Sequence, residues 1–328
     1  MSKIASHLVY EYGKELAQKP TRDGYGEALC ELGETNPQVV VMDADLAKST
    51  RTEWFWKKYP DRFFDAGIAE QNMLCMCAGL SRAGKIPFAS TYGVFVAGRA
   101  WDQIRTTVCY SCLNVKIGGA HAGISVGPDG ATHQALEDIA LMRVLPYMTV
   151  VSPCDFEQTK KAVHCAADTY GPIYMRFGRE PTPIISSADT PFELGKGQVF
   201  REGTDATIIA TGPMVKSSLD AAEELATEQG LQVRVINLHT LKPIDADLIE
   251  QAARETGCIV TAEEHQVMAG FGSAVAEVVV QRCPVPMRFI GIQDRWGESG
   301  EPDQLMDVFG LLPRDLKAGV LEVLKAKK

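Results

Sequence analysis

The sequence predicts an α/β protein built from two doubly wound domains, each a parallel sheet covered by helices on both faces. Apolar runs of strand length alternate with stretches of helical periodicity along most of the chain, an order typical of such sheets. The alternation breaks between residues 179 and 197, where three prolines and several small polar residues indicate an extended connector. A length of 328 residues also favours two domains, at roughly 150 residues each. We therefore expect one domain at residues 1–188 and a second at 189–328.

The first half contains six runs that predict strands. A proline-led run ends before Tyr92, and a helical pattern extends from Ala69 to Arg82. One run leads into Gly118 and Gly119, where we expect that strand to end. Besides the proline-led run, the expected strands cover residues 39–42, 63–65, 115–117, 148–151 and 173–175.

The second half repeats the same order of elements. A helix is expected through Leu219 to Leu225, between the first two of four apolar runs. The four runs cover residues 206–210, 233–236, 258–262 and 287–290. This order predicts a second sheet of the same kind.

Composition excludes several classes of protein. The formal net charge is −9 and no basic block occurs, which argues against binding to nucleic acid or to an anionic membrane. No stretch approaches the ~20 apolar residues that span a bilayer. Residues Met1 to Ala5 open a mixed-charge segment rather than the apolar core of a signal peptide. Nine cysteines, an odd number, favour reduced thiols and a cytoplasmic location.

Four polar loops follow predicted strands, at the sheet edge where ligands of open α/β proteins gather. The third loop is rich in glycine and holds two histidines and an acid within thirteen residues, which favours polar recognition or proton transfer. The polar residues of the four loops include Asp45, Ser49, Glu70, His121, Asp129, His133, Arg176 and Arg179.

Glu70 allows two interpretations. An acid in the first turn of a helix is favoured by the helix dipole, so a purely structural role is possible. The neighbouring Ile68, Met73 and Leu74 are apolar, however, and would bury the carboxyl group. A buried acid could share a proton with a ring nitrogen of a ligand.

The other candidates also have structural alternatives. His133 could cap a helix that runs on through Leu136 and Ile139. A zinc site is the competitor for the histidine pair, but no Cys or Glu stands at ligand spacing. Tyr92 and Phe95, three residues apart, are more typical of a core than of a platform for a flat ring.

Several motifs together resemble the transketolase family. In the first half they are Ile68–Asn72, His121 and the segment Pro128–Gln134. In the second half they are His239–Asp245 and Glu263–Glu277. The resemblance covers nearly the whole chain, but it corresponds only to the pyrimidine-binding and C-terminal domains of a full-length enzyme.

The remaining domain of the family is missing from this sequence. Family members bind thiamine diphosphate through Mg²⁺ with a Gly-Asp-Gly motif and a later Asn, and Gly-Asp-Gly occurs nowhere here. No Asn follows Asp129 at the required spacing. The chain therefore resembles the C-terminal subunit of a split transketolase. The implied partner is an N-terminal subunit that carries the diphosphate domain and the metal ligands, in an α2β2 assembly.

The resemblance also implies roles for individual residues. Glu70 would contact N1′ of the aminopyrimidine of thiamine diphosphate and favour its imino tautomer, which is general acid–base chemistry on the cofactor. Tyr92 and Phe95 would hold the aminopyrimidine ring, and Asp45 would lie close to the cofactor. The implied reaction transfers a two-carbon ketol unit from a ketose phosphate to an aldose.

Further positions match those that bind the substrate. The implied sugar-hydroxyl ligands are His121, Asp129 and His133, and His133 would also assist proton transfer. The implied phosphate ligands are Arg22, Ser49 and Arg179, because arginine offers a planar fork of donors. Arg176 is expected as an extra basic residue beside the phosphate.

Two departures leave the substrate open. Gly98-Arg99 replaces a third aromatic residue of longer transketolases, and Ala122 replaces an acid after the first histidine. These changes are compatible with a branched, sulfonated or deoxy sugar. Alternatives are a subunit similar to deoxyxylulose-phosphate synthase, one similar to the β subunit of a 2-oxo-acid dehydrogenase, or a non-catalytic scaffold.

Overall fold

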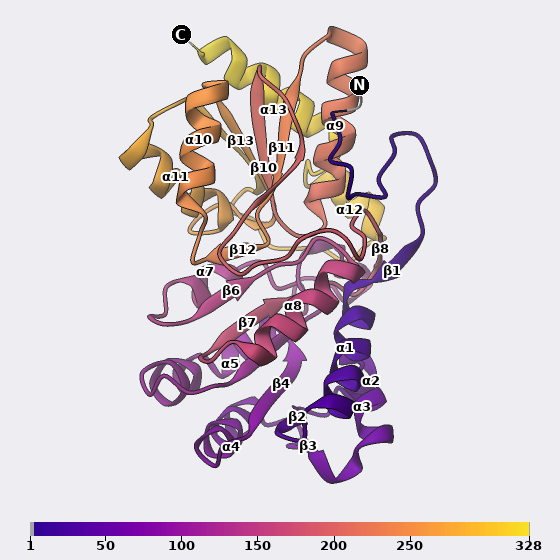
Figure 1. Cartoon of the computed structure of the whole chain (residues 1–328), viewed down its shortest axis with the longest axis vertical. Helices are drawn as coiled ribbons and strands as arrows, with labels where there is room; N and C mark the ends of the chain where they lie inside the picture. The colour runs from indigo at the N-terminus through magenta and orange to yellow at the C-terminus, as the bar shows by residue number, and fades with distance from the viewer. Residues whose placement is uncertain (1–2, 328) are drawn as a thin grey trace.

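The structure is a computed structural model that describes residues 3–327, so Met1 and Ser2 of the predicted mixed-charge start lie outside it. The two halves of the chain form two α/β units that follow one another along the long axis of the molecule. The first half lies at the bottom of Figure 1 and the second half at the top. This confirms the predicted fold of two α/β domains with mainly parallel sheets.

The first sheet has seven strands. From edge to edge they are β12 (Thr240–Lys242), β6 (Thr149–Val151), β7 (Ile173–Arg176), β5 (Lys116–Ala120), β4 (Ile86–Tyr92), β2 (Val39–Asp43) and β3 (Phe63–Asp65). All neighbouring pairs are parallel except β12 with β6. The edge strand β12 comes from the second half of the chain, so the second half extends the first sheet.

The second sheet has five strands and is parallel apart from β9. In order they are β14 (Met287–Ile292), β13 (Ile259–Gln266), β10 (Ala206–Ala210), β11 (Val233–Asn237) and β9 (Gln198–Arg201). The expected extended connector contains β8 (Pro181–Pro183), which pairs with β1 (Gln18–Pro20) as a separate ribbon.

Alternation of side chains along the strands explains why helices cover both faces of the first sheet. In β2, Val39 and Val41 point to one core and Met42 to the other. The first of these cores contains α1 (Thr21–Thr35), α3 (Thr52–Lys58) and α8 (Phe156–Asp168). The second contains α4 (Glu70–Arg82), α5 (Gly93–Arg99), α6 (Trp101–Gln103), the π-helix Ile104–Cys109 and α7 (Asp138–Arg143).

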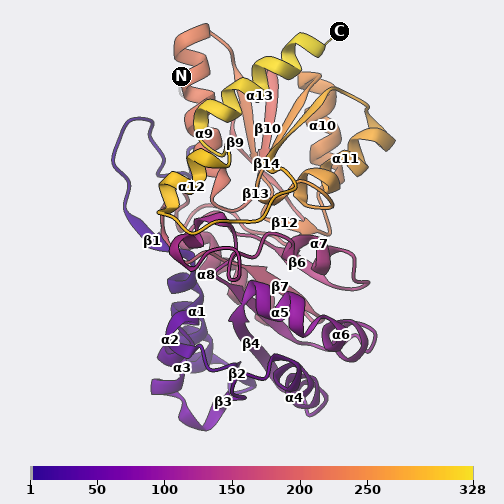
Figure 2. The same ribbon diagram turned by 180° about the vertical axis from the view of Figure 1, so that it is seen from behind.

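The second core continues without a break into the second half of the chain, where it includes α10 (Ala246–Thr256) and α11 (Phe271–Arg282). The other face of the second sheet is covered by α9 (Met214–Gln229), α12 (Pro302–Val308) and α13 (Pro313–Ala326), as the reverse view in Figure 2 shows. The remaining short helices are α2 (Ala47–Thr50) and the 3₁₀ turns Pro60–Arg62 and Ile124–Asp129.

The predicted end of one strand is wrong. The strand β5 does not end before Gly118 and Gly119 but runs through both of them to Ala120. Tyrosine rings cover these glycines, and a Cβ atom at Gly119 would lie 2.2 Å from the Tyr174 hydroxyl. The glycines therefore allow close packing of the rings on the strand rather than terminating it.

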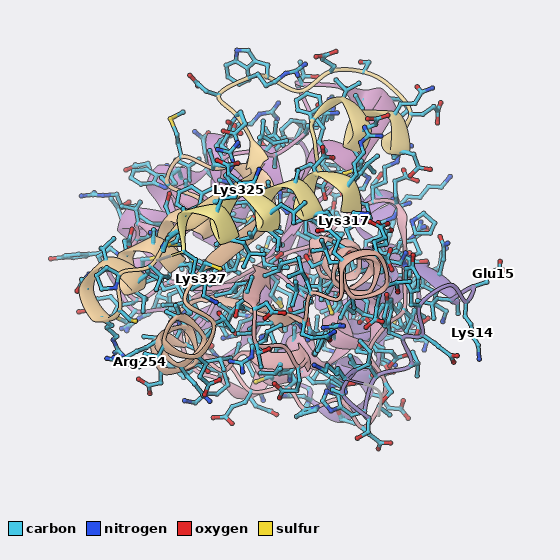
Figure 3. All side chains as sticks on the ribbon, turned by 90° about the horizontal axis from the view of Figure 1, so that it is seen from above. Lys14, Glu15, Arg254, Lys317, Lys325 and Lys327 are labelled. Atoms are coloured by element: carbon cyan, nitrogen blue, oxygen red, sulfur yellow. The ribbon has the colours of Figure 1, made fainter. Side chains whose placement is uncertain are left out.

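Figure 3 views the molecule from above, over the second half, and labels six charged residues on that side. Three of the basic residues are paired with acids: Lys14 pairs with Glu11, Lys317 of α13 bridges to Glu224 and Glu228 of α9, and Arg254 pairs with Glu250 within α10. Among residues 3–327, no helix has the length and apolar character needed to cross a membrane.

Candidate active site

The order of the parallel strands brings the predicted site residues to one edge of the first sheet. Strands β3, β2, β4, β5 and β7 are successive neighbours, and each runs in the same direction. Their carboxyl ends therefore lie side by side, as expected for a ligand site in an open α/β sheet. Tyr92 is the last residue of β4, and the residues that follow the other ends are Asp45, Glu70, His121 and Arg179.

Glu70 is the first residue of α4 and its side chain is only 6% exposed. Met73 and Leu74 are buried beside it in the sequence, as expected, but Ile68 is 76% exposed and does not bury the carboxylate. The Nη1 atom of Arg99 donates a hydrogen bond to Oε1 of Glu70 at 2.8 Å. The carboxylate is thus buried but accessible from the side on which Arg99 lies.

In the sequence, Arg99 stood out only as part of a departure from the family pattern, and its contact with Glu70 was not predicted. The guanidinium carbon of Arg99 lies 3.9 Å from the centre of the Phe95 ring. Phe95 and Arg99 are four residues apart in α5, a spacing that places side chains on the same face of a helix. That spacing was the signal that could have linked the two residues.

Four rings form a continuous cluster next to this ion pair. Tyr92 is stacked with Phe95, with ring centres 5.5 Å apart, and with His121, at 4.0 Å. His133 meets Tyr92 and Phe95 edge-on, at 5.9 and 5.4 Å. Two aromatic residues, two histidines and the Glu70–Arg99 pair thus occupy one small region.

His121 is held in an unusual backbone conformation, with φ of 55°, and is 2% exposed. Burial lowers the pKa of His121 to about 3, and the nearby charges of Arg22, Arg179 and Arg51 add to this effect. The ring is therefore neutral near pH 7. Its Nδ1 atom has no hydrogen-bond partner among the described residues, which leaves it free for a ligand hydroxyl.

Basic side chains approach His121 from three elements. The Nη1 atom of Arg22, in the first turn of α1, lies 3.4 Å from Nε2 of His121 and donates to the Ser49 carbonyl oxygen at 3.1 Å. Arg179 pairs with Asp129 at 3.2 Å. Arg51, which the sequence analysis missed, is held by Asp23 at 2.7 Å. Its position two residues after Ser49 was the available signal.

Asp45, which is predicted to lie close to the cofactor, follows strand β2 at the same edge of the sheet. It is exposed, has a φ of 61°, and its backbone N–H donates to Asp65 at 3.1 Å. Its side chain forms no hydrogen bond or ion pair with Glu70 or Tyr92 in the part of the chain that the structure describes. The buried acid of the same loop is Asp43, which accepts hydrogen bonds from the Thr50 and Thr52 hydroxyls and so secures the loop.

The expected position of Arg176 is wrong. Arg176 is 4% exposed, and its Nε atom donates to both oxygens of Asp138 at 3.2 and 3.0 Å. Its Nη2 atom donates to the carbonyl oxygens of Ala135 and Glu264. Arg176 therefore joins the two halves of the chain and is not available to bind a phosphate.

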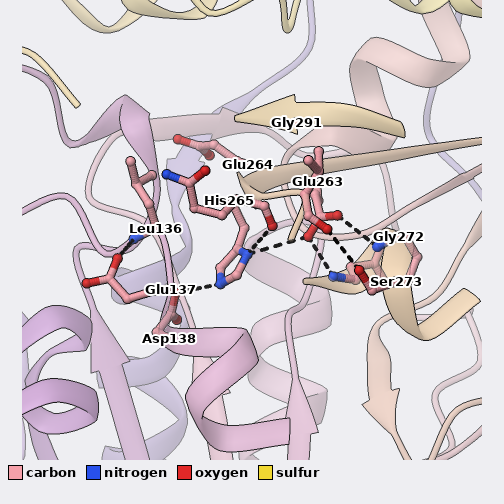
Figure 4. A network of polar contacts seen from close by, with 12 residues as sticks. Leu136, Glu137, Asp138, Glu263, Glu264, His265, Gly272, Ser273 and Gly291 are labelled. Carbon is pink, nitrogen blue, oxygen red and sulfur yellow. Dashed lines mark hydrogen bonds and ion pairs between the residues drawn. The ribbon is translucent and has the colours of Figure 1, made fainter. Parts of the chain in front are cut away.

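Figure 4 shows this junction, where His265 lies between Asp138 of the first half and Glu263 of the second. All three side chains are fully buried. The Ser125 backbone N–H also donates to Glu264, and Gln134 donates to the Glu298 carbonyl oxygen. The loop that carries His121, Asp129 and His133 is thus fixed by the second half of the chain.

The capping role considered for His133 is also wrong. The helix α7 begins at Asp138 with Glu137 as its N-cap, and His133 lies in the preceding turn. The Nδ1 atom of His133 is instead 2.9 Å from the Thr132 hydroxyl. Within residues 3–327, no group of three His, Cys, Asp or Glu side chains is arranged to hold a metal ion.

Comparison with known proteins agrees with this architecture. The transketolase pyrimidine-binding domain family matches residues 17–183, and the transketolase C-terminal domain family matches residues 195–316. A 6-deoxy-6-sulfo-D-fructose transketolase subunit from Clostridium sp. is 41% identical over 93% of this chain and 95% of its own length. Human transketolase is 37% identical, but the match covers 92% of this chain and only 48% of the human protein.

A solved structure described as a split-gene transketolase in an "inactive beta4 tetramer" is 51% identical. It superposes with a TM-score of 0.89 over 94% of this chain and 99% of the other. Similarity therefore extends over both halves of the chain in sequence and in structure. The chain belongs to the transketolase family, and it matches chains of the split type over nearly their whole length.

Proposed function

We propose that this chain, together with a separate N-terminal subunit, forms a thiamine-diphosphate-dependent transketolase. The observation that carries the proposal is the buried carboxylate of Glu70 beside the rings of Tyr92 and Phe95. A buried acid next to stacked aromatic side chains suits a flat, hydrogen-bonding ring such as an aminopyrimidine. When bound, the cofactor would supply the nucleophilic carbon that carries the ketol unit.

In this proposal Glu70 contacts N1′ of the aminopyrimidine and moves a proton at that atom, while Tyr92 and Phe95 orient the ring. Asp45 would lie near the cofactor. The unpartnered Nδ1 of His121 supports a contact to a sugar hydroxyl. Asp129 and His133 complete the sugar site, and His133 assists proton transfer.

Arg22, Ser49 and Arg179 would bind the phosphate of the sugar, and Arg51 adds positive charge beside them. The reaction is transfer of a two-carbon ketol unit from a ketose phosphate to an aldose. The similarity to a subunit that acts on a sulfonated fructose supports a specialised sugar as one form of this activity.

The partner is proposed to contribute the diphosphate-binding domain and the Mg²⁺ ligands, in an α2β2 assembly. Support comes from the missing Gly-Asp-Gly motif and from the related split-gene chain that forms an inactive tetramer by itself. We further propose a pyrimidine-binding domain at residues 1–188, a C-terminal domain at 189–328, and a cytoplasmic location. Nine free thiols support that location.

The first test is calorimetric titration of thiamine diphosphate with Mg²⁺ into this chain alone and into its mixture with the N-terminal subunit. Binding and ketol transfer should appear only in the mixture. Tight binding or turnover by the single chain would refute the shared site. Release of CO₂ from pyruvate by the mixture would instead indicate the chemistry of a related thiamine enzyme.

The second test is Glu70→Gln in the reconstituted complex, which should lower activity by about 10²- to 10⁴-fold. Asp247→Asn is the matched control, because Asp247 is also a first-turn acid paired with an arginine but lies in α10 of the other domain. Unchanged activity of Glu70→Gln would favour a non-catalytic scaffold.

A further inference from the structure

Arg99 makes both contacts that the proposed function assigns to the aminopyrimidine ring. It donates to Oε1 of Glu70 at 2.8 Å, and its guanidinium lies 3.9 Å from the centre of the Phe95 ring. A planar guanidinium over an aromatic ring occupies the same kind of position as a stacked heterocycle. The Arg99 side chain thus makes the same kinds of contact that the aminopyrimidine ring is proposed to make.

The contacts of Glu70 and Phe95 indicate which group a bound ring would displace. The Phe95 ring is already contacted by Tyr92, stacked at 5.5 Å, and by His133, edge-on at 5.4 Å. Arg99 is the one side chain that hydrogen-bonds to Glu70 among residues 3–327. A ring that makes the same two contacts, to Oε1 of Glu70 and to the face of Phe95 that Arg99 covers, must therefore take the place of the guanidinium.

The Arg99 side chain is also exposed enough to move away from Glu70 and Phe95. Its side chain is 48% exposed, whereas that of Glu70 is 6% exposed. It lies at the C-terminal end of α5. Because nearly half of its surface already faces solvent, the Arg99 side chain can turn outward while the buried Glu70 side chain stays in place.

From this geometry we propose that Arg99 is a built-in placeholder: it occupies the aminopyrimidine position in the free chain and must swing out when the cofactor binds. The inference rests on the proposed function. It predicts that the free chain keeps the buried carboxylate of Glu70 paired until the cofactor arrives, and that cofactor affinity is reduced by the cost of separating Arg99 from Glu70 and Phe95.

The test is titration of thiamine diphosphate with Mg²⁺ into complexes of the N-terminal subunit with wild type, Arg99→Met and Arg82→Met. Arg82 is the matched control because it is also a basic residue at the end of a helix, α4. Arg99→Met should bind the cofactor about 5- to 30-fold more tightly, the sum of a part-exposed ion pair and a cation–π contact. Arg82→Met should bind as wild type does.

Two further measurements guard against misfolding of a variant. Thermal unfolding of the isolated chain should occur at a lower temperature for Arg99→Met than for wild type, because Glu70 loses its partner. In a Glu70→Gln background, Arg99→Met should change cofactor affinity much less than in wild type.

The outcomes are distinguishable. Equal or weaker cofactor binding by Arg99→Met would overturn the placeholder and leave the proposed function intact, since the arginine would then be neutral or a cofactor ligand. If no complex binds thiamine diphosphate at all, both the placeholder and the proposed function fail.

Discussion

Arg176 and Asp138 offer a direct test of how the two halves of the chain hold together. The perturbation is Arg176→Met, which removes a guanidinium that donates to Asp138 and to the carbonyl oxygens of Ala135 and Glu264. Asp138 would keep a hydrogen bond from the Tyr174 hydroxyl but lose its counter-ion. Because Asp138 is fully buried, its charge would be left without compensation.

Removing one partner of a buried ion pair costs about 3–5 kcal/mol, and the two stranded carbonyl groups add to that cost. A typical domain has a free energy of unfolding of about 5–15 kcal/mol, so the variant should lose a large part of its stability. The assay is urea denaturation of the isolated chain followed by circular dichroism. Arg254→Met is the control, since Arg254 is paired with Glu250 on the exposed surface of α10 and should change little.

The double variant Asp138→Asn/Arg176→Met separates the energy of the ion pair from that of the other contacts of the two side chains. It should be more stable than the sum of the two single effects predicts, because it contains no uncompensated charge. A loss of less than about 1 kcal/mol for Arg176→Met would refute the reasoning. The arginine would then not be the main link between the halves.

Three other predictions concern acid stability, packing and substrate binding. Burial lowers the pKa of His239 from 6.5 to about 4, so the unfolded chain takes up a proton at a higher pH than the folded chain does. About 3 kcal/mol of stability should therefore be lost as the pH falls from 6.5 to about 4. His239→Gln should show a flatter pH dependence of stability in urea titrations, and an unchanged slope would contradict this. Gly119→Ala should lower the free energy of unfolding by about 1–3 kcal/mol because the new Cβ atom would meet Tyr174. Gly79→Ala, in an open position of α4, should raise it by about 1 kcal/mol. Equal melting temperatures for the two variants would be inconsistent with the packing. In the reconstituted complex, Arg22→Met should raise KM for a phosphorylated sugar about 10- to 100-fold, with a smaller effect on the unphosphorylated sugar; equal effects on both would remove Arg22 from the phosphate site.

Much of the fold followed from local patterns. Runs such as Val39–Met42 and Met287–Ile290 predicted strands correctly because short runs rich in β-branched, aromatic or other large apolar residues are informative without tertiary context. The end of β5 was mispredicted because the partners of Gly118 and Gly119 are the rings of Tyr25 and Tyr174, which are distant in sequence. Glycine signals a turn locally, and only the packed rings show that it permits close contact here.

The candidate site shows the same division. Sequence alone determined that this chain carries the transketolase pattern around Glu70, His121 and His133, because those motifs are short and contiguous. Tertiary structure decided which partner each charged side chain has. Arg176 donates to the Asp138 carboxylate and to the Glu264 carbonyl oxygen, which are 38 and 88 positions away in the sequence. Arg99 donates to Glu70, which is 29 positions away. The physical reason is that the energetic effect of a charged side chain depends on its partner and its burial. Both depend on which strands and helices become neighbours in the folded chain.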